Sequence, residues 1–431
     1  MSENIKSLLR FLDDSPCNFL AVNAARNLLE KSGFVKRELS DSFADIKPGD
    51  KFYTTKNDSA IFAFTIGDNT PGEMTFKIVA AHSDSPCFRV KPAGVISGEG
   101  GMVRLNTEVY GGPILYTWFD RPLSLAGRVV LRGNDVLRPI SRLIHIKRPL
   151  LTIPHLAIHF NRAVNEGNSL SKQRDMLPLI GIVTNHLESD GLLLRLVSDE
   201  LNVPRESILD FDLMLYDCAP ACTFGLHNEF ISSGRLDDLS MVHAALTAIT
   251  RAVDTHATCV AAIFDNEETG SGTKQGAASP VLTSVLQRIV AARGGDYESF
   301  ARATQRSFMI SADNAHAFHP NYPGKYDPTN HPYLGGGPVV KINANCKYMT
   351  DAHSAAVFKS LCRAAGEPCQ YFVNHSDVAG GSTLGNILTA QIDIEGVDVG
   401  NPILAMHSAR ETASVSDHDA MIEVMTEFFR L

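Results

Sequence analysis

A short apolar segment that ends in two adjacent glutamates constrains the fold of this chain most. Residues 258–264 read Thr-Cys-Val-Ala-Ala-Ile-Phe, a run of small and branched side chains that favours a buried strand. Asp265-Asn-Glu-Glu-Thr-Gly270 follows directly. Open α/β sheets carry their chemistry at the carboxyl ends of strands, and carboxylates buried there need cations beside them. The segment therefore predicts a metal site on an α/β sheet, with a solvated acidic turn as the plainer alternative.

Length and charge narrow the class of protein. A chain of 431 residues is longer than one core usually serves, so we expect two domains. The 39 basic and 48 acidic residues give a net charge of −9, which argues against nucleic acid and against an anionic membrane surface as partners. No apolar run reaches the length of a membrane span. Eight scattered cysteines and an N-terminus without a signal pattern predict reduced thiols and a cytoplasmic protein.

The periodicity of the apolar residues predicts an α/β domain with an insertion. Helices are expected over 4–32 with a break at 13–16, over 238–253, between Asp351 and Gly366, and over 418–430. Strands are expected over 76–81, 258–264, 308–312 and 370–373. Between about 88 and 229, short alternating segments and turn signals indicate mostly β structure. The predicted domains are therefore 1–87 with 230–431, an α/β domain in two parts, and 88–229, a β-rich domain.

Residues that commonly bind metals follow several of the predicted strands or begin a predicted helix. They are His82, Asp84, Asp237, Asp238, Glu267, Glu268, Asp313 and His407. Each has a plain alternative, because an Asp can cap a helix and a His can be a hydrogen-bonded core residue. Jointly, two histidines and three carboxylates supply one bridging carboxylate and two terminal ligands for each of two metals. Such a set suits zinc, with cobalt or manganese as substitutes.

Several motifs carry a resemblance to a known family. They are Ala80-Ala-His-Ser-Asp-Ser-Pro86, Gly234-Arg-Leu-Asp-Asp238, Phe264-Asp-Asn-Glu-Glu-Thr-Gly-Ser271, Ser311-Ala-Asp-Asn-Ala-His316, Ala405-Met-His-Ser408 and, in the insertion, Trp118-Phe-Asp-Arg121 and Ile153-Pro-His-Leu-Ala-Ile-His159. Together they resemble the aspartyl aminopeptidase family of two-zinc exopeptidases over essentially the whole chain. The resemblance implies an α/β fold whose mixed-sheet zinc-exopeptidase catalytic domain is interrupted by a β-rich dimerisation domain. It also implies a homo-oligomer in which six dimers form a tetrahedral dodecamer.

Carried over position by position, the resemblance assigns roles to the site residues. His82, Asp237 and Asp313 would hold one zinc, and Asp237, Glu268 and His407 would hold the other. Glu267 would be the general base, and Asp84 would orient His82. His159 would stabilise the tetrahedral intermediate, from its own chain or from the partner subunit. A histidine tucked into a β-rich interface is the alternative for His159.

The resemblance also implies a substrate class. It predicts an aminopeptidase that acts on peptides with a free N-terminus and prefers an N-terminal Asp or Glu. Lys341 would supply the cation that binds the acidic side chain, and an ordinary strand lysine is its alternative. Two other classes stay open. One is a different two-metal hydrolase, such as an N-acyl amino acid deacylase or a carboxypeptidase. The other is a non-catalytic assembly protein, against which the complete ligand set argues.

Overall fold

The computed structural model describes residues 1–182, 191–253 and 255–431, which form two compact units. The first unit comprises Met1–Asp84, Ala221–Met406 and Glu411–Leu431, and the second comprises Ser85–Pro220 and His407–Arg410. The mixed α/β class expected from the sequence is confirmed. The domain boundaries at 87/88 and 229/230 stay a prediction. Among the described helices, none has the length and apolar character needed to cross a membrane.

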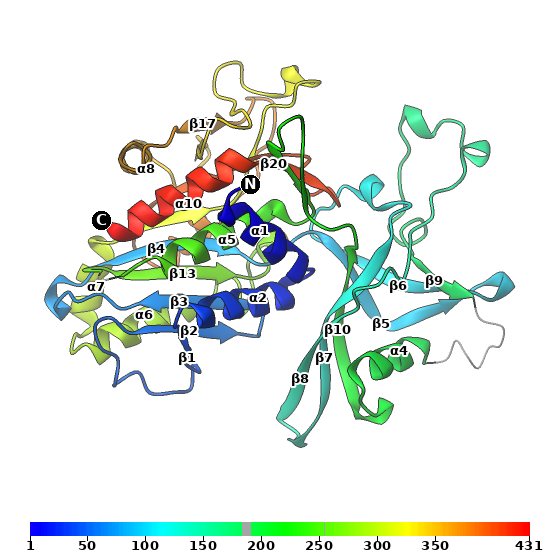
Figure 1. Ribbon diagram of the computed structural model, residues 1–431, viewed down its shortest axis with the longest axis horizontal. Coiled ribbons are helices and arrows are strands. Elements are labelled where there is room, and N and C mark those ends of the chain that lie inside the picture. Colours follow the sequence, from blue (N-terminus) through cyan, green and yellow to red (C-terminus); the bar gives the residue numbers. More distant parts are fainter. Residues whose placement is uncertain (183–190, 254) are drawn as a thin grey trace. The chain divides into compact units, whose positions relative to one another are not determined.

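A nine-stranded mixed sheet is the centre of the first unit (Figure 1). Its strands, in spatial order, are β1 (Val35–Lys36), β2 (Lys51–Lys56), β3 (Ala60–Thr65), β13 (Thr258–Phe264), β4 (Phe76–His82), β14 (Phe308–Ala312), β18 (Glu395–Gly400), β16 (Val339–Ile342) and β17 (Gln370–Val373). Both β13 and β14 run parallel to their neighbour β4, with Phe264 opposite His82. The carboxyl ends of these three central strands therefore lie at one edge of the sheet, where the predicted ligands follow them.

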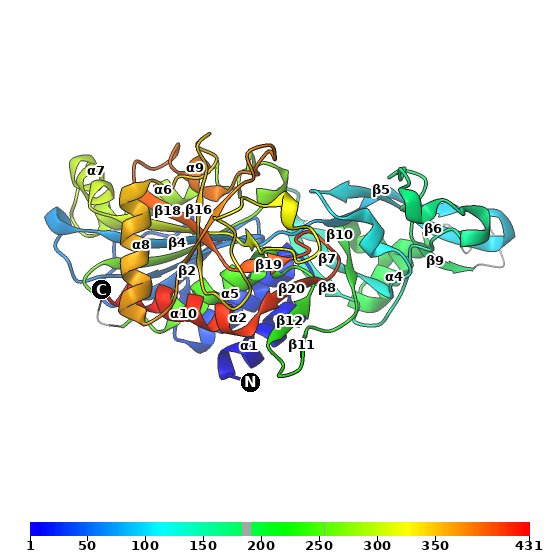
Figure 2. The same cartoon turned by 90° about the horizontal axis from the view of Figure 1, so that it is seen from above.

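Helices cover both faces of this sheet (Figures 1 and 2). The helices of the first unit are α1 (Glu3–Asp14), α2 (Asn18–Lys31), α5 (Leu236–Thr250), α6 (Val281–Ala292), α7 (Tyr297–Gln305), α8 (Ala352–Ala365), α9 (Leu384–Leu388) and α10 (Val415–Arg430). Alternate residues of β4 face opposite ways, as a strand requires. Val79 and Ala81 join a core with α1, α2, α5, α8 and α10, whereas Ile78 and Ala80 join a core with α6, α7 and α9.

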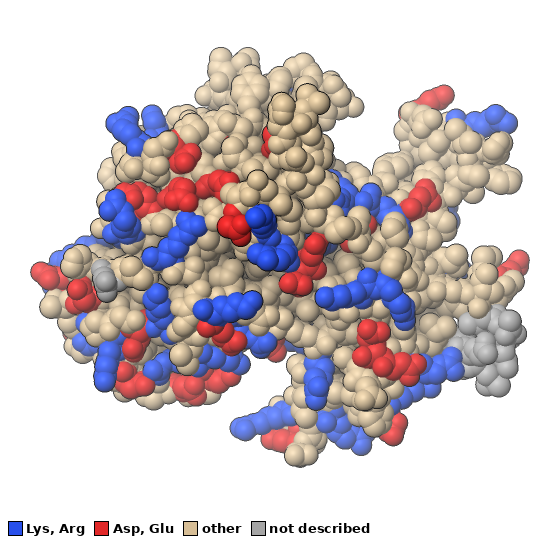
Figure 3. Space-filling view, in the orientation of Figure 1, with Lys and Arg blue, Asp and Glu red and all other residues tan. Residues whose placement is uncertain are grey.

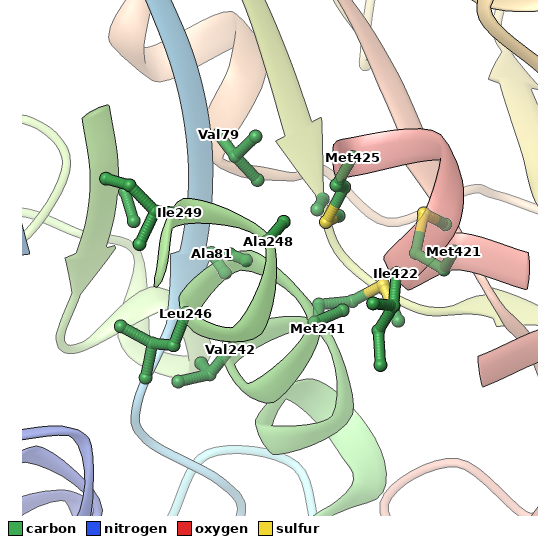
Figure 4. Packing of buried hydrophobic residues seen from close by; sticks show 14 of the residues in the cluster. Val79, Ala81, Met241, Val242, Leu246, Ala248, Ile249, Met421, Ile422 and Met425 are labelled. Atoms are coloured by element: carbon green, nitrogen blue, oxygen red, sulfur yellow. The ribbon is translucent and has the colours of Figure 1, made fainter. Parts of the chain in front are cut away.

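Helix α5 is the centre of the first of these two cores. Figure 4 shows Leu246 and Ile249 of α5 near Val79 and Ala81 of the sheet, and Met241 facing α10. Nearly every residue of α5 is buried, because the helix lies between the sheet and other helices. Its first turn carries Asp237 and Asp238, so this packing fixes the position of two candidate ligands.

A smaller sheet and short 3-10 turns complete the first unit. The sheet contains, in spatial order, β11 (Cys222–Phe224), β12 (Phe230–Ser233), β20 (Glu411–Ser414), β19 (Pro402–Leu404) and β15 (Ala315–His316). The turns are η1 (Pro71–Glu73), η7 (Glu267–Thr269) and η8 (Pro323–Lys325).

The second unit is built on a six-stranded antiparallel sheet. In spatial order its strands are β8 (Arg138–His145), β7 (Leu123–Asp135), β10 (Ile208–Asp217), β5 (Cys87–Ser97), β6 (Met102–Tyr110) and β9 (Leu179–Ile182). The unit also contains α4 (Leu192–Leu201), a helix within the stretch for which the sequence indicates mostly β structure, and the turns η2 (Glu99–Gly101), η3 (Leu115–Trp118), η4 (Ile158–Phe160), η5 (Val164–Glu166) and η6 (Arg205–Ser207).

Candidate metal centre

The first unit brings most of the predicted site residues together at the carboxyl ends of its central strands. His82 ends β4, the two glutamates stand in η7 after β13, and Asp313 follows β14. His82, Asp237, Asp238 and Asp313 each offer a ligand atom within 4.8 Å of the others. A second group within the same limit consists of His82, Glu267 and Glu268. The clustering of these buried and half-buried imidazole and carboxylate groups is the chemistry of a zinc site.

His82 is oriented by its contacts with Asp84. Its Nδ1 lies 3.1 Å from the backbone oxygen of Asp84 and 3.4 Å from the carboxylate oxygen Oδ1. The other ring nitrogen, Nε2, lies 3.8 Å from Asp237 Oδ1 and 4.0 Å from Asp238 Oδ2. These separations exceed a hydrogen bond and match the scale of ligand atoms around a shared ion. Nε2 therefore faces the carboxylates with which it would share a metal.

The carboxylate of Asp84 has a further contact that the sequence did not suggest. Oδ1 accepts a hydrogen bond from the backbone N–H of Glu267 at 3.1 Å, and Oδ2 accepts one from Glu268 at 3.2 Å. The buried carboxylate of Asp84 thus binds the backbone of both glutamates, and the backbone oxygen of Asp84 also contacts His82. The geometry of η7 is fixed by this double contact.

Asp237 and Asp238 are not placed as helix caps. The N-cap position of α5 is Arg235, and both aspartates depart from helical backbone angles inside the first turn. The backbone N–H of Asp237 donates to Glu411 Oε2 at 3.1 Å. Asp238 Oδ2 accepts from the backbone N–H of His82 at 3.1 Å, and its Oδ1 lies 3.4 Å from Asn314 Nδ2. The side chains of both aspartates are directed to the cluster.

Burial shifts the proton affinities of these groups. Burial, with nearby carboxylates, raises the pKa of Asp238 well above its usual value and raises the pKa of Glu267 to about 8. Burial opposes the charged form of His82, but Asp238, Asp84 and Glu267 outweigh it and raise the pKa of His82. Burial raises the pKa values of Asp238 and Glu267, and neighbouring carboxylates add to it, whereas the pKa of His82 is raised by those carboxylates against burial. Cations at the centre would favour the charged form of the carboxylates.

Lys341 is a buried cation beside Asp313. Its Nζ donates to the backbone oxygen of Asp313 at 2.7 Å, lies 3.3 Å from that of Asn314, and lies 3.5 Å from Asp313 Oδ1. Burial would lower the pKa of Lys341, but the neighbouring Asp313 outweighs burial and raises it. Lys341, a residue only 2% exposed, is therefore charged next to a candidate ligand.

His407 and His159 are grouped with the second unit. His407 Nδ1 lies 3.0 Å from the backbone oxygen of Gly112, a contact that fixes a proton on Nδ1 and leaves Nε2 as the ligand atom. His159 stands in the turn η4 and is exposed. The place of both histidines at the metal centre stays a prediction.

Three buried polar residues near the cluster were not singled out from the sequence. Asn314 contacts Asp238 and Lys341, Glu411 contacts Asp237, and Asp265 precedes the glutamate turn. Asn314 and Asp265 lie inside motifs that carry the resemblance, so their positions gave a signal. Glu411 lies on β20 and gave none.

Comparisons with known proteins point to one family. Residues 11–429 match the family model described as Aminopeptidase I zinc metalloprotease (M18). The Probable M18 family aminopeptidase 2 of Clostridium novyi (strain NT) is 49% identical over 424 residues, covering 98% of each chain. A solved chain from the cryo-EM structure of the Ape4 and Nbr1 complex has a TM-score of 0.95 at 36% identity, over 99% of this chain and 85% of that chain. The S. cerevisiae mApe1 dodecamer has a TM-score of 0.86 at 26% identity, over 99% and 96%.

The fold, the cluster and these relatives define a zinc metallo-aminopeptidase, which is a hydrolase of peptide bonds. The chain belongs to the M18 family, the aspartyl aminopeptidase family, and the family predicted from the motifs is confirmed.

Proposed function

We propose that this enzyme uses two metal ions to release an N-terminal residue, preferably Asp or Glu, from peptides with a free N-terminus. The observation that carries the proposal is the group of ligand atoms from His82, Asp237, Asp238 and Asp313, all within 4.8 Å of one another beside Glu267. The M18 family supports the aminopeptidase activity. The number of ions, the acidic preference and the residue roles are parts of the proposal.

Two zinc ions, or cobalt or manganese in their place, fit the donor set. His82, Asp237 and Asp313 would hold one ion, and Asp237, Glu268 and His407 would hold the other. When bound, such a pair supplies Lewis acidity that activates water and polarises the scissile carbonyl. Asp238 also offers a ligand atom in this group, but we assign it a supporting role, because its Oδ2 accepts from the backbone N–H of His82 and its Oδ1 lies 3.4 Å from the Asn314 amide.

Glu267 acts as the general base in this proposal. It accepts the proton of the attacking water and passes that proton to the leaving amine. Asp84 fixes the backbone of Glu267, which holds its carboxylate at the cluster. His159 stabilises the charge that develops on the tetrahedral intermediate, from the same chain or from a partner subunit.

Lys341 is proposed to favour an acidic N-terminal residue. It is a buried cation at the metal centre, and a charge in a water-poor site acts strongly at short range. Its contact with Asp313 supports a second interpretation, in which Lys341 stabilises the ligand Asp313. The substrate dependence of a Lys341 variant separates the two.

We further propose that residues 88–229 form a dimerisation domain and that six dimers form a dodecamer. The dodecameric mApe1 relative supports this assembly. Strands β8 and β9 end the six-stranded sheet, and exposed edge strands favour pairing or cover. A cytoplasmic location without nucleic-acid or membrane partners is also proposed. Reduced thiols support that location, because none of the eight cysteines, all in described segments, forms a disulfide.

An assay of substrates with free and blocked N-termini tests the proposed reaction. The enzyme should release Asp or Glu from chromogenic amides with a free amine, act more slowly on Ala and Leu amides, and leave their N-acetylated forms intact. Release of the acyl group from N-acetyl amino acids would favour a deacylase instead. Removal of residues from the carboxyl end of peptides would favour a carboxypeptidase.

A further inference from the structure

We propose that Asn18 is a positioning residue of the metal centre, which acts through Asp265 on the turn that carries Glu267 and Glu268. The inference rests on the proposed two-metal function, and it concerns a residue, Asn18, that has no role in that proposal. Asn18 is the first residue of α2, and 247 positions separate it from Asp265.

The contact between Asn18 and Asp265 is buried and uses the whole side chain of Asn18. Asn18 Nδ2 lies 3.1 Å from Asp265 Oδ1 and 3.0 Å from Oδ2. The other end of the amide, Oδ1, accepts from the backbone N–H of Phe19 at 3.0 Å, which fixes the orientation of the group. Asn18 is 4% exposed and Asp265 is 1% exposed. A buried contact to a carboxylate is costly to lose, because the carboxylate is then left without that donor.

Asp265 connects this contact to the glutamate turn. It is the residue directly after β13, and its Oδ1 also accepts from the backbone N–H of Asn266 at 2.8 Å. Its own backbone N–H donates to the oxygen of Gln275 at 3.1 Å. The carboxylate of Asp84 binds the backbone N–H groups of Glu267 and Glu268, which follow Asn266 in the chain. The turn is therefore fixed from one side by Asp84 and from the other by Asp265 and Asn18.

The junction between α1 and α2, where Asn18 lies, also contacts the segment that carries Asp237. Arg235 Nε donates to the backbone oxygen of Ser15 at 3.0 Å, and Nη2 lies 3.4 Å from that of Leu12. Arg235 stands two residues before Asp237 in a left-handed conformation, at φ 61°. A cation at the carboxyl end of α1 also interacts favourably with the helix dipole.

The junction of α1 and α2 therefore contacts both segments that carry metal ligands from α5 and β13. Figure 1 shows these two helices beside α5, and their apolar residues share one core with it. Partners that hold ligands in place commonly change metal affinity or activity by about 10- to 100-fold when they are removed. Substitution of Asn18 removes one such partner without changing any proposed metal ligand.

The test compares Asn18→Ala with Asn23→Ala in the full-length enzyme. Asn23 is a matched control on the same helix, since its Oδ1 accepts from Arg26 and neither ligand segment is involved. Zinc affinity is measured by competition with a chromophoric chelator, and kcat and KM are measured on an Asp amide at saturating zinc. We expect Asn18→Ala to bind zinc about 10- to 100-fold more weakly and to lose about 10-fold in kcat with KM changed less than about twofold.

A purely structural role of Asn18 would give a different result. Asn18→Ala would then lower the melting temperature of the metal-free protein, while zinc affinity and kcat stayed within about twofold of Asn23→Ala, and the inference would be wrong. If Asn18→Ala does not fold, Asn18→Ser keeps a donor at the start of α2 and is judged by the same two readings. Failure of the proposed function is distinguishable, because the unmodified enzyme would then bind no zinc or release no N-terminal residue.

Discussion

Glu267 and Glu268 are adjacent in the chain but have different proposed duties. Both stand in one turn, and both backbone N–H groups bind the carboxylate of Asp84. With the backbone fixed in this way, consecutive side chains leave the turn in different directions. One glutamate can therefore be a metal ligand while the other exchanges protons, and each role has its own signature in a variant.

The variant Glu267→Gln tests the general base. The amide keeps the size of the side chain but cannot take up a proton, so kcat should fall by on the order of 100-fold or more while both metals stay bound. The measurements are kcat on an Asp amide and metal content after gel filtration. A kcat near that of the unmodified enzyme would place the base at another residue. The control is Glu268→Gln, which should weaken metal binding as well as rate.

The variant Lys341→Ala tests acidic specificity. Loss of the cation would leave the substrate carboxylate buried without its partner, at a cost of about 2–5 kcal/mol. That cost corresponds to a loss on the order of 30- to several thousand-fold in kcat/KM for Asp and Glu substrates, with Ala and Leu substrates spared. Equal losses on all four would instead mean that Lys341 supports Asp313, whose Oδ1 is 3.5 Å from Nζ.

Sequence patterns predicted which residues belong to the site but not the contacts between them. Glu267, Glu268 and Asp313 follow apolar runs, so their strand-end positions could be predicted. The contact of Asn18 with Asp265 could not, because 247 positions separate the two and no periodicity links them. The double contact of Asp84 with the glutamate backbone likewise depends on β4 and β13 pairing in register.

At the scale of elements, α1, α5 and α10 meet around a buried pair of histidines. His243 Nδ1 lies 3.0 Å from His418 Nε2, and His243 Nε2 lies 3.0 Å from Ser7 Oγ. Burial lowers the pKa of His243, and the positive charges of the nearby His418 and Arg251 lower it further. Burial also lowers the pKa of His418, to about 4, although the nearby Asp419 acts in the opposite direction. Both rings are therefore neutral in the folded protein at pH 7.

This pair predicts loss of stability in mild acid. The pKa of His418 in the folded protein lies below the value of 6.5 for an ordinary histidine, so the unfolded chain binds the proton more tightly. The contribution of neutral His418 to the free energy of unfolding is therefore complete above pH 6.5 and is lost as the pH falls toward 4. At pH 5.5 the loss for His418 alone is about 1 kcal/mol of unfolding free energy. Denaturant unfolding at pH 7.5 and 5.5, with excess chelator to remove metal effects, measures it. His418→Gln should show a smaller difference between the two pH values, and an equal difference would contradict the account.

Individual elements could be predicted where the pattern was strong. The strands β13, β14 and β17 have the predicted bounds, and α8 lies between Asp351 and Gly366 as expected. Helix α10 begins at Val415, three residues before the predicted start, and contains Asp417, whose carboxylate binds the backbone N–H groups of Gly335 and Gly337 at 2.8 Å each. Such tertiary contacts move helix ends in ways that local periodicity does not record.

At the scale of the whole molecule, charge does not guide an acidic substrate. The net charge is −9, and Figure 3 shows basic and acidic side chains interspersed on the face drawn. A negative protein does not attract acidic peptides over long distances. The proposed preference for Asp or Glu must therefore arise from short-range contacts at the site.

Assembly is the prediction that belongs to this scale. Sedimentation equilibrium should show a species of roughly twelve chains, as in the dodecameric mApe1 relative. A stable monomer with full activity would contradict both the assembly and a contribution of His159 from a partner subunit.

The most direct test of the account is a zinc titration of chelator-stripped enzyme, followed by hydrolysis of an Asp amide with a free amine. We expect activity to return only as the second equivalent of zinc binds to each chain, because the proposed ligands of the two ions share Asp237. Full activity with one equivalent, or none at any zinc concentration in correctly folded protein, would contradict the two-metal aminopeptidase that the cluster of His82, Asp237, Asp238 and Asp313 supports.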